Sequence, residues 1–268
     1  MKSQSLTSMR MTHDVIVIGG GSAGYAAART AHDAGADVAI VDQGPLGGLC
    51  ILRGCMPTKA ILRSAEVAAL LRRTKEFGLS PVSAHADLSA IVDRKDRLVR
   101  EFADYRIQQL QDPRFTLYQS RAVFLSPHEV TVGDSVLSAG SFIIATGSRP
   151  SEVLIPGLAQ TGYFTSDTIL DLRTQPGSLI VLGGGAVALE LSQFFARLGT
   201  KVTILQRGPT LLSEMDEDVG RALEAALTDE GIKVVTGTQL LRVTRDTAGK
   251  AVWAMKDGRE RCYVGQEI

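Results

Sequence analysis

The feature that most restricts the fold of this chain is an internal repeat. Residues 15–45 (VIVIGGGSAGYAAARTAHDAGADVAIVDQGP) align without a gap on residues 179–209 (LIVLGGGAVALELSQFFARLGTKVTILQRGP), so each position has a counterpart 164 residues along the chain. In each copy a short apolar run, Val15–Ile18 or Leu179–Leu182, is typical of a fully buried parallel strand. Glycines, a helical stretch and a second apolar run follow, so the sequence predicts two βαβ units.

Three positions in each copy predict a site for a dinucleotide. The first makes a tight turn, the second lets a pyrophosphate approach the backbone, and the third lets the helix pack on the strand. The N-terminus of such a helix offers N–H groups and a partial positive charge. One glycine-rich turn has an ordinary structural explanation, but two between strand and helix favour two nucleotide sites. The positions are Gly19, Gly21 and Gly24 in the first copy and Gly183, Gly185 and Ala188 in the second.

The residue that ends the second strand differs between the copies. Asp42 can accept both hydroxyls of an adenosine ribose, as an FAD or NAD site requires. Its counterpart is Gln206, which is followed by Arg207. A missing carboxylate and a neighbouring guanidinium favour a 2′-phosphate, although Arg207 can equally be a solvated loop cation. The second site is therefore predicted to prefer NADPH over NADH.

The pattern predicts an α/β protein with two Rossmann-like dinucleotide-binding domains, each with a βαβ unit and a small β-meander. We expect a disordered leader at 1–12, a first domain at 13–150 and a second at 151–268. Helices are expected near 65–73, 88–110 and 217–230. The second of these carries four cations that are expected to form a solvated face: Arg94, Lys95, Arg97 and Arg100.

Composition excludes several classes of function. Lys+Arg and Asp+Glu number 29 each, so no global field draws the chain to nucleic acid or to an anionic membrane. No apolar run approaches the ~20 residues that cross a bilayer. Three cysteines do not make a secreted disulfide framework, and the polar N-terminus does not resemble a signal peptide. The sequence therefore predicts a cytoplasmic protein.

Two of the three cysteines, Cys50 and Cys55, lie in "GGLCILRGCMPTKA". On a regular helix they would be ~140° apart around the axis and ~7.5 Å along it, whereas a disulfide needs Cα atoms within ~4.4–6.8 Å. They can bond only where the chain is distorted, and Gly54 supplies that freedom. Two unbonded thiols remain a possible explanation; a zinc site is disfavoured, because neither Cys262 nor the four histidines have ligand spacing.

Four motifs in order, "VIVIGGGSAG", "GGLCILRGCMP", "IIATGSRP" and the second glycine motif, resemble the class I pyridine nucleotide-disulfide oxidoreductases. This family includes dihydrolipoamide dehydrogenase, glutathione reductase and mercuric reductase, and the resemblance covers residues 12–268. It implies that electrons pass from NADPH or NADH through FAD to a Cys50–Cys55 disulfide. Cys55 would face the flavin, Cys50 would attack the acceptor, and Lys59, paired with Glu190, would point at the flavin ring. The alternatives for these two are an ordinary surface cation and an exposed carboxylate.

The resemblance also implies the residues that contact the cofactors. In the first unit they are Gly19, Gly21, Ser22, Ala23, Gly24, Asp42, Gly48, Leu49, Cys50, Lys59, Ala122, Thr146 and Gly147. In the second unit they are Gly183, Gly185, Ala186, Val187, Glu190, Gln206 and Arg207. The acceptor implied is a small-molecule or protein disulfide, or Hg(II).

Three departures from the family pattern affect the expected function. Ala186 stands where some members have a tyrosine that gates the nicotinamide pocket, and Leu52 and Arg53 stand where an asparagine and a small apolar residue are usual. The sequence also lacks the family's last flavin-binding segment and its C-terminal dimer domain, which supplies a histidine–glutamate pair. An alternative expectation is therefore a truncated, catalytically incomplete protein that binds nucleotides without turnover.

Overall fold

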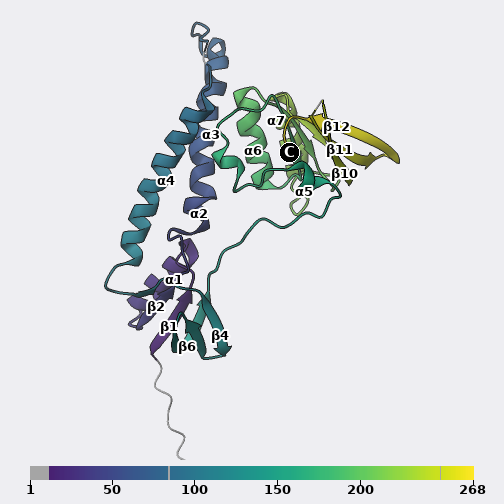
Figure 1. Ribbon diagram of the computed structural model, residues 1–268. Coiled ribbons are helices and arrows are strands. Elements are labelled where there is room, and N and C mark those ends of the chain that lie inside the picture. The colour runs from purple at the N-terminus through teal and green to yellow at the C-terminus, as the bar shows by residue number, and fades with distance from the viewer. Residues whose placement is uncertain (1–11, 84, 248) are drawn as a thin grey trace, which may run out of the picture. The chain divides into compact units, whose positions relative to one another are not determined.

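The computed structural model describes residues 12–83, 85–247 and 249–268, which belong to two compact units (Figure 1). Of the described residues, the first unit comprises 12–52 and 98–149, and the second comprises those within 53–97 and 150–268. The chain crosses between the units a second time between Arg149 and Pro150. The expected leader at 1–12 lies outside the described residues, apart from Thr12.

The first unit is built on a six-stranded sheet in the order β3-β2-β1-β6-β5-β4. Strands β1, β2 and β3 are parallel, and the first half of the repeat supplies β1, α1 and β2. The long strand β6 pairs in parallel with β1 at its end and antiparallel with β5 at its start, which gives the predicted meander. The elements are β1 (His13–Ile18), α1 (Ser22–Asp33), β2 (Val38–Val41), α2 (Gly48–Leu52), β3 (Thr116–Tyr118), β4 (Ala122–Ser126), β5 (Glu129–Val132) and β6 (Ser135–Ile144).

Alternation along β1 explains why this sheet has a core on each face. Ile16 is buried in one cluster with Val130 and Val132 of the meander, whereas Val17 is buried in another with Ala28 of α1 and Leu110. Neighbouring side chains of a strand point to opposite faces of the sheet. A strand in which every residue is apolar therefore has buried side chains on both faces. The parallel arrangement fixes the end of β1 beside the start of α1.

The second unit repeats the parallel arrangement in a sheet of order β7-β8-β9 and adds a separate antiparallel sheet of order β10-β11-β12. The predicted fold class, two Rossmann-like units each with a small meander, is confirmed. The parallel half of the second unit contains α5 (Leu158–Thr161), the short 3₁₀ helix η2 (Ile169–Asp171), β7 (Ser178–Leu182), α6 (Ala186–Leu198), β8 (Lys201–Leu205), α7 (Glu217–Asp229) and β9 (Lys233–Val235). Strands β10 (Gln239–Asp246), β11 (Gly249–Lys256) and β12 (Arg259–Gly265) form the meander.

Residues 53–97 pack within the second unit rather than the first, which the predicted domain at 13–150 did not anticipate. They contain α3 (Cys55–Arg72), the 3₁₀ helix η1 (Thr74–Phe77) and the first part of α4 (Leu88–Leu110). Ile61 and Ala65 of α3 and Val92 of α4 share one buried core with Phe194 and Phe195 of α6. Burial of these apolar side chains accounts for the association, at roughly 25 cal/mol per Å² removed from water.

Lys95 corrects the expectation of a solvated face on α4. Its side chain is only 5% exposed, and its Nζ donates to the Leu170 carbonyl oxygen at 3.0 Å and to Asp171 Oδ1 at 2.8 Å. The buried ammonium group is tolerated because it donates hydrogen bonds to both of these oxygens. Helix α4 is therefore fixed to η2 by a buried cation.

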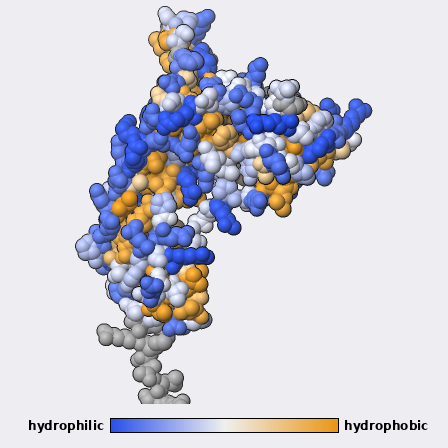
Figure 2. All heavy atoms as spheres, in the orientation of Figure 1, coloured by the Kyte–Doolittle hydropathy of each residue, from blue (hydrophilic) through white to orange (hydrophobic). Residues whose placement is uncertain are grey.

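Apolar side chains also reach the surface of the first unit at its meander (Figure 2). None of the helices among the described residues is long and apolar enough to cross a membrane. The exposed apolar residues of the meander are Val123, Phe124, Leu125, Val136 and Ile144.

Candidate functional site

The first predicted nucleotide site lies where β1 meets α1. Gly19 has a φ of 107°, and a Cβ at Gly24 would lie 1.7 Å from the Gly19 carbonyl oxygen, so both positions require glycine. Asp42 at the end of β2 accepts the Gly20 N–H through Oδ2 at 2.6 Å and the Gly44 N–H through Oδ1 at 2.7 Å. These bonds orient its carboxylate beside the glycine turn, where each oxygen keeps a lone pair for a ribose hydroxyl.

The loop before the cysteines lies directly against this turn. A Cβ at Gly48 would lie 2.4 Å from the Cα of Gly21, so the two backbones are in close contact. Gly21 is the N-cap of α1 and makes no side-chain capping bond, which leaves the helix N–H groups to other acceptors. A cradle of glycine backbone, a helix N-terminus and Asp42 fits the diphosphate and ribose of FAD. Ser22 and Ala23 begin α1, and Leu49 belongs to α2.

The "ATG" segment after β6 lies beside the same glycine. A Cβ at Gly19 would lie 2.2 Å from the Ala145 carbonyl oxygen, and the Ala145 N–H donates to the Ile18 carbonyl oxygen at 2.8 Å. Thr146 and Gly147 follow directly, and Gly147 has a φ of 74°. Ala122 is the first residue of β4, the edge strand that β5 separates from β6 in the sheet. The structure therefore brings "ATG" to the predicted site.

The second predicted nucleotide site has the same backbone arrangement, with a glutamine where the first site has an aspartate. Gly183 has a φ of 109°, and a Cβ at Gly185, the N-cap of α6, would have open space around it. Gln206 accepts the Gly184 N–H through Oε1 at 2.9 Å, as Asp42 does for Gly20. Its Nε2 donates to the Thr210 carbonyl oxygen at 3.3 Å. Gln206 is thus buried and bonded at both ends.

The remaining predicted residues of this site lie at its mouth. Arg207 is exposed directly after Gln206, and Ala186 and Val187 form the first turn of α6, where Val187 is 52% exposed. An exposed guanidinium next to a buried amide can contact a 2′-phosphate without losing an internal partner. The geometry fits a pyridine nucleotide on this unit.

The two cysteines lie on either side of a break between helices. Helix α2 ends at Leu52 and α3 begins at Cys55, with Gly54 at φ −126° and ψ −114°. The expected departure from one regular helix is therefore present. Cys50 is half-buried and Cys55 is exposed. The order of exposure is opposite to that implied for an attacking Cys50, and the roles of the two thiols stay predictions.

Lys59 and Glu190 form an ion pair within the second unit. Lys59 lies one turn into α3 and Glu190 lies on α6, and Nζ and Oε1 are 2.5 Å apart. Their side chains are 60% and 35% exposed, so the pair contributes little to stability. It fixes the direction of the lysine that follows the cysteines in the chain.

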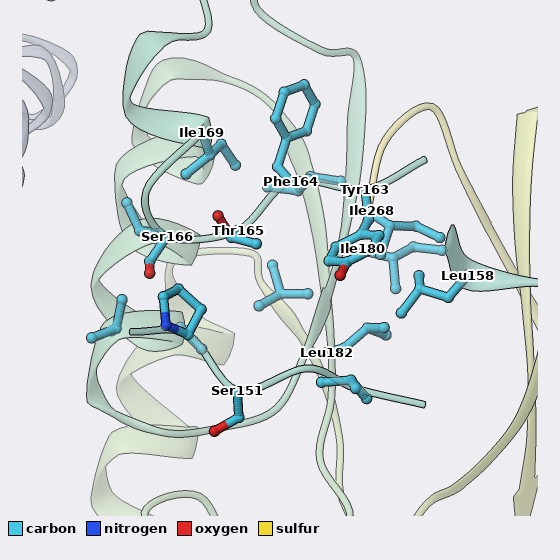
Figure 3. A pocket seen from close by; sticks show the side chains of 17 residues that line it. Ser151, Leu158, Tyr163, Phe164, Thr165, Ser166, Ile169, Ile180, Leu182 and Ile268 are labelled. Carbon is cyan, nitrogen blue, oxygen red and sulfur yellow. The ribbon is translucent and has the colours of Figure 1, made fainter. Parts of the chain in front are cut away.

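One contact near the cysteines had no signal in the sequence. The Arg53 guanidinium lies 3.4 Å from Asp167 Oδ2, in a turn far along the chain. The same turn lines a cavity of about 250 Å³ in the second unit, together with Ile180 and Leu182 of β7 and Leu158 (Figure 3). Among the described residues, no cluster of three or more His, Cys, Asp or Glu side chains is arranged to hold a metal ion.

The fold and the site define a protein with two dinucleotide-binding units and a cysteine pair. The family model described as "Pyridine nucleotide-disulphide oxidoreductase" matches residues 13–264, and the chain belongs to this family of flavoprotein oxidoreductases. Membership implies the use of FAD and a pyridine nucleotide.

Similar proteins include a mercuric reductase of Lysinibacillus sphaericus, 36% identical over 96% of this chain and 47% of that protein. A dihydrolipoyl dehydrogenase of Bacillus subtilis (strain 168) is 34% identical over 88% of this chain and 53% of its own length. Among solved structures, the HOCl-induced flavoprotein disulfide reductase RclA from Escherichia coli is 27% identical. Its TM-score is 0.77, over 95% of this chain and 55% of that one. The chain thus spans about half the length of the relatives it matches.

Proposed function

We propose that this chain is the FAD- and NAD(P)H-binding part of a disulfide oxidoreductase that carries electrons to the Cys50–Cys55 pair and on to an acceptor. The observation that carries the proposal is the Lys59–Glu190 ion pair at 2.5 Å. It joins the helix that starts at the second cysteine to the first helix of the second βαβ unit. This pair matches the lysine and the acid that the family resemblance places beside the flavin.

The chain's own residues divide the work between two units. In the first, the glycine turn, the N-terminus of α1 and Asp42 bind and orient FAD, which when bound supplies the two-electron chemistry between nicotinamide and disulfide. In the second, the turn at Gly183–Gly185 and Arg207 bind the pyridine nucleotide. The buried, fully bonded Gln206 and the exposed Arg207 support NADPH over NADH.

The thiols carry the electrons to the acceptor. Cys55 occupies the first position of an 18-residue helix, whose N-terminal partial charge favours a thiolate there. We assign Cys55 to the flavin side and Cys50 to thiol exchange with the acceptor, and Lys59, held by Glu190, to orientation against the flavin. These residue roles follow the family resemblance. The acceptor is a disulfide or Hg(II), and relatives of either kind are similar to this chain.

Because the chain spans about half the length of its relatives, a second candidate is a protein that binds nucleotides without turnover. A cytoplasmic location remains part of the proposal.

The test is anaerobic reduction of the purified chain with bound FAD. NADPH should bleach the flavin, and a long-wavelength charge-transfer band should appear and disappear in Cys55→Ser while flavin is retained. A band that is unchanged in Cys55→Ser contradicts the roles given to the thiols. NADPH binding without flavin reduction supports the second candidate.

A further inference from the structure

Arg106, in the C-terminal half of α4, belongs to the first unit and is half-buried. Its Nε and Nη1 atoms are shielded from solvent, and neither has a hydrogen-bond partner among the residues that the structure describes. The Oε1 atom of Gln109, three residues further along α4, is also buried and unpaired, so it is not the missing acceptor. Shielding the donors of a charged group without an acceptor costs free energy. Arg106 therefore has donors that an anionic ligand can satisfy.

Tyr25 holds the guanidinium through its charge rather than through its donors. The Cζ atom of Arg106 lies 4.3 Å from the centroid of the Tyr25 ring, within the range of a cation–π contact. The face of an aromatic ring attracts the positive charge, but it supplies no oxygen acceptor to the N–H groups. The contact therefore positions Arg106 and leaves Nε and Nη1 unbonded.

Two contacts place Arg106 beside the first predicted nucleotide site. Tyr25 lies in the first turn of α1, and its N–H donates to the carbonyl oxygen of Gly21, the N-cap, at 2.9 Å. Leu110 follows Arg106 by one helical turn on the same face of α4. A Cβ at Gly20 would lie 3.1 Å from Leu110 Cδ1, so this face of α4 reaches the glycine turn. All five residues belong to the first unit.

The chemistry at this position favours the diphosphate of FAD as the acceptor. The carboxylate of Asp42, at the same turn, already accepts the N–H groups of Gly20 and Gly44 at 2.6 and 2.7 Å. The diphosphate carries the negative charge of FAD, and it is the part of the cofactor that a helix N-terminus such as that of α1 binds. A guanidinium donates to phosphate oxygens in charge-assisted hydrogen bonds, which are stronger than those between neutral groups.

We propose that Arg106, held by Tyr25, is a further cofactor-binding residue of the first unit and that its guanidinium donates to the diphosphate of FAD. This inference rests on the proposed function and specifies one contact of its flavin nucleotide. Without FAD, the unpaired donors of Arg106 lower the stability of the chain, and with FAD they are hydrogen-bonded. The same side chain therefore destabilises the cofactor-free chain and strengthens binding of the cofactor.

The test compares the affinity for oxidised FAD with the stability of the FAD-free chain. Quenching of flavin fluorescence gives the Kd, and urea denaturation without FAD gives the stability. Arg106→Met should raise the Kd for FAD about tenfold, because charge-assisted hydrogen bonds are lost. The FAD-free variant should be as stable as the unmodified chain or more stable, because no charged donor is left unpaired. Arg106→Lys should retain part of the affinity, since it keeps the charge.

Arg114→Met is the matched control in the same unit. Arg114 also lies over an aromatic ring, that of Phe115, but its Nε is paired with Asp112 Oδ1 at 3.0 Å. Its removal should leave the Kd for FAD unchanged. An Arg106→Met Kd equal to that of the unmodified chain overturns the inference, also where both bind FAD too weakly to measure, and so does an equal loss of affinity in Arg114→Met.

The stability measurement separates a binding role from a structural one. An Arg106→Met chain that is less stable without FAD and binds FAD as tightly as before would make Arg106 a structural cation and overturn the inference. Binding of oxidised FAD requires neither reductant nor thiols. A chain that binds FAD through Arg106 but shows no charge-transfer band on reduction would therefore count against the proposed function alone.

Discussion

Gln206 occupies in the second unit the place that Asp42 occupies in the first. Asp42 Oδ2 accepts the N–H of Gly20 at 2.6 Å, and Gln206 Oε1 accepts the N–H of Gly184, 164 residues further on, at 2.9 Å. The backbone bond that holds the glycine turn is preserved while the charge is removed. The turn itself therefore does not need a carboxylate. The presence or absence of the carboxylate instead determines whether the site favours a ribose with a free 2′-hydroxyl or one with a 2′-phosphate.

Arg207→Ala is expected to weaken NADPH binding about tenfold and NADH binding little, because an exposed guanidinium beside an uncharged Gln206 has a 2′-phosphate as its natural partner. Nucleotide fluorescence titration of the chain measures both constants. Arg221→Ala is the control, because that arginine is exposed on α7 and paired with Glu217 at 3.1 Å. Equal weakening of NADH and NADPH would show that Arg207 does not read the 2′-phosphate.

Glu190→Gln is expected to leave stability within about 1 kcal/mol, because the Lys59–Glu190 pair is largely exposed. It should nevertheless weaken the charge-transfer band, since Lys59 loses the partner that sets its direction. Chemical denaturation and anaerobic titration measure the two effects on one preparation. Glu66→Gln, which removes the partner of Arg63 on the same helix, should leave the band intact. A full band in Glu190→Gln would contradict the orienting role.

Ser192→Ala is expected to stabilise the second unit by about 1 kcal/mol. Ser192 is 0% exposed on α6, and among the described residues its Oγ has no hydrogen-bond partner. Burying a hydroxyl without a partner costs free energy that alanine does not incur, and alanine is the better helix former. Thermal unfolding measures the change. Thr200→Ala is the contrast, because that buried hydroxyl donates to the Pro176 carbonyl oxygen at 2.8 Å and its removal should destabilise.

Hydrophobic periodicity and glycine placement predicted the elements that depend only on residues close together in the sequence. The two βαβ units, the helix at 88–110 and the helix near 217–230 follow from periodicity and glycine placement, and α4 and α7 were found at Leu88–Leu110 and Glu217–Asp229. The packing of residues 53–97 with the second unit depends on tertiary contacts between α3 and α6, which no local pattern contains. Lys95 shows the same limit: besides the adjacent Asp96, its ammonium group needs acceptors 75 and 76 residues away.

The candidate site divides in a similar way. Its glycines and Asp42 were predictable because a strand–turn–helix places them by itself. The approach of Lys59 to Glu190 was implied by family resemblance rather than by spacing. Asp167 was missed because an aspartate in a polar turn has no distinguishing neighbours in the sequence. Its partner Arg53 is 3.4 Å away and more than a hundred residues earlier.

The contribution of Glu230 to stability is expected to vanish in acid. Arg197 donates to Glu230 from Nε at 2.7 Å and Nη2 at 2.6 Å, and these bonds lower the pKa of the carboxyl below its ordinary 4.5. A carboxyl with a lowered folded-state pKa stabilises the fold above the unfolded pKa and loses that effect as pH falls through the folded value.

Glu230→Gln should therefore cost about 1–2 kcal/mol of unfolding free energy at pH 7, and the difference from the unmodified chain should shrink as the pH falls below 4.5. Urea denaturation across this range measures it. Glu217→Gln, which breaks an exposed pair with Arg221, should change little at any pH. A Glu230→Gln deficit that stays constant from pH 7 to pH 3 would mean that the loss arises from packing rather than from the charged hydrogen bonds.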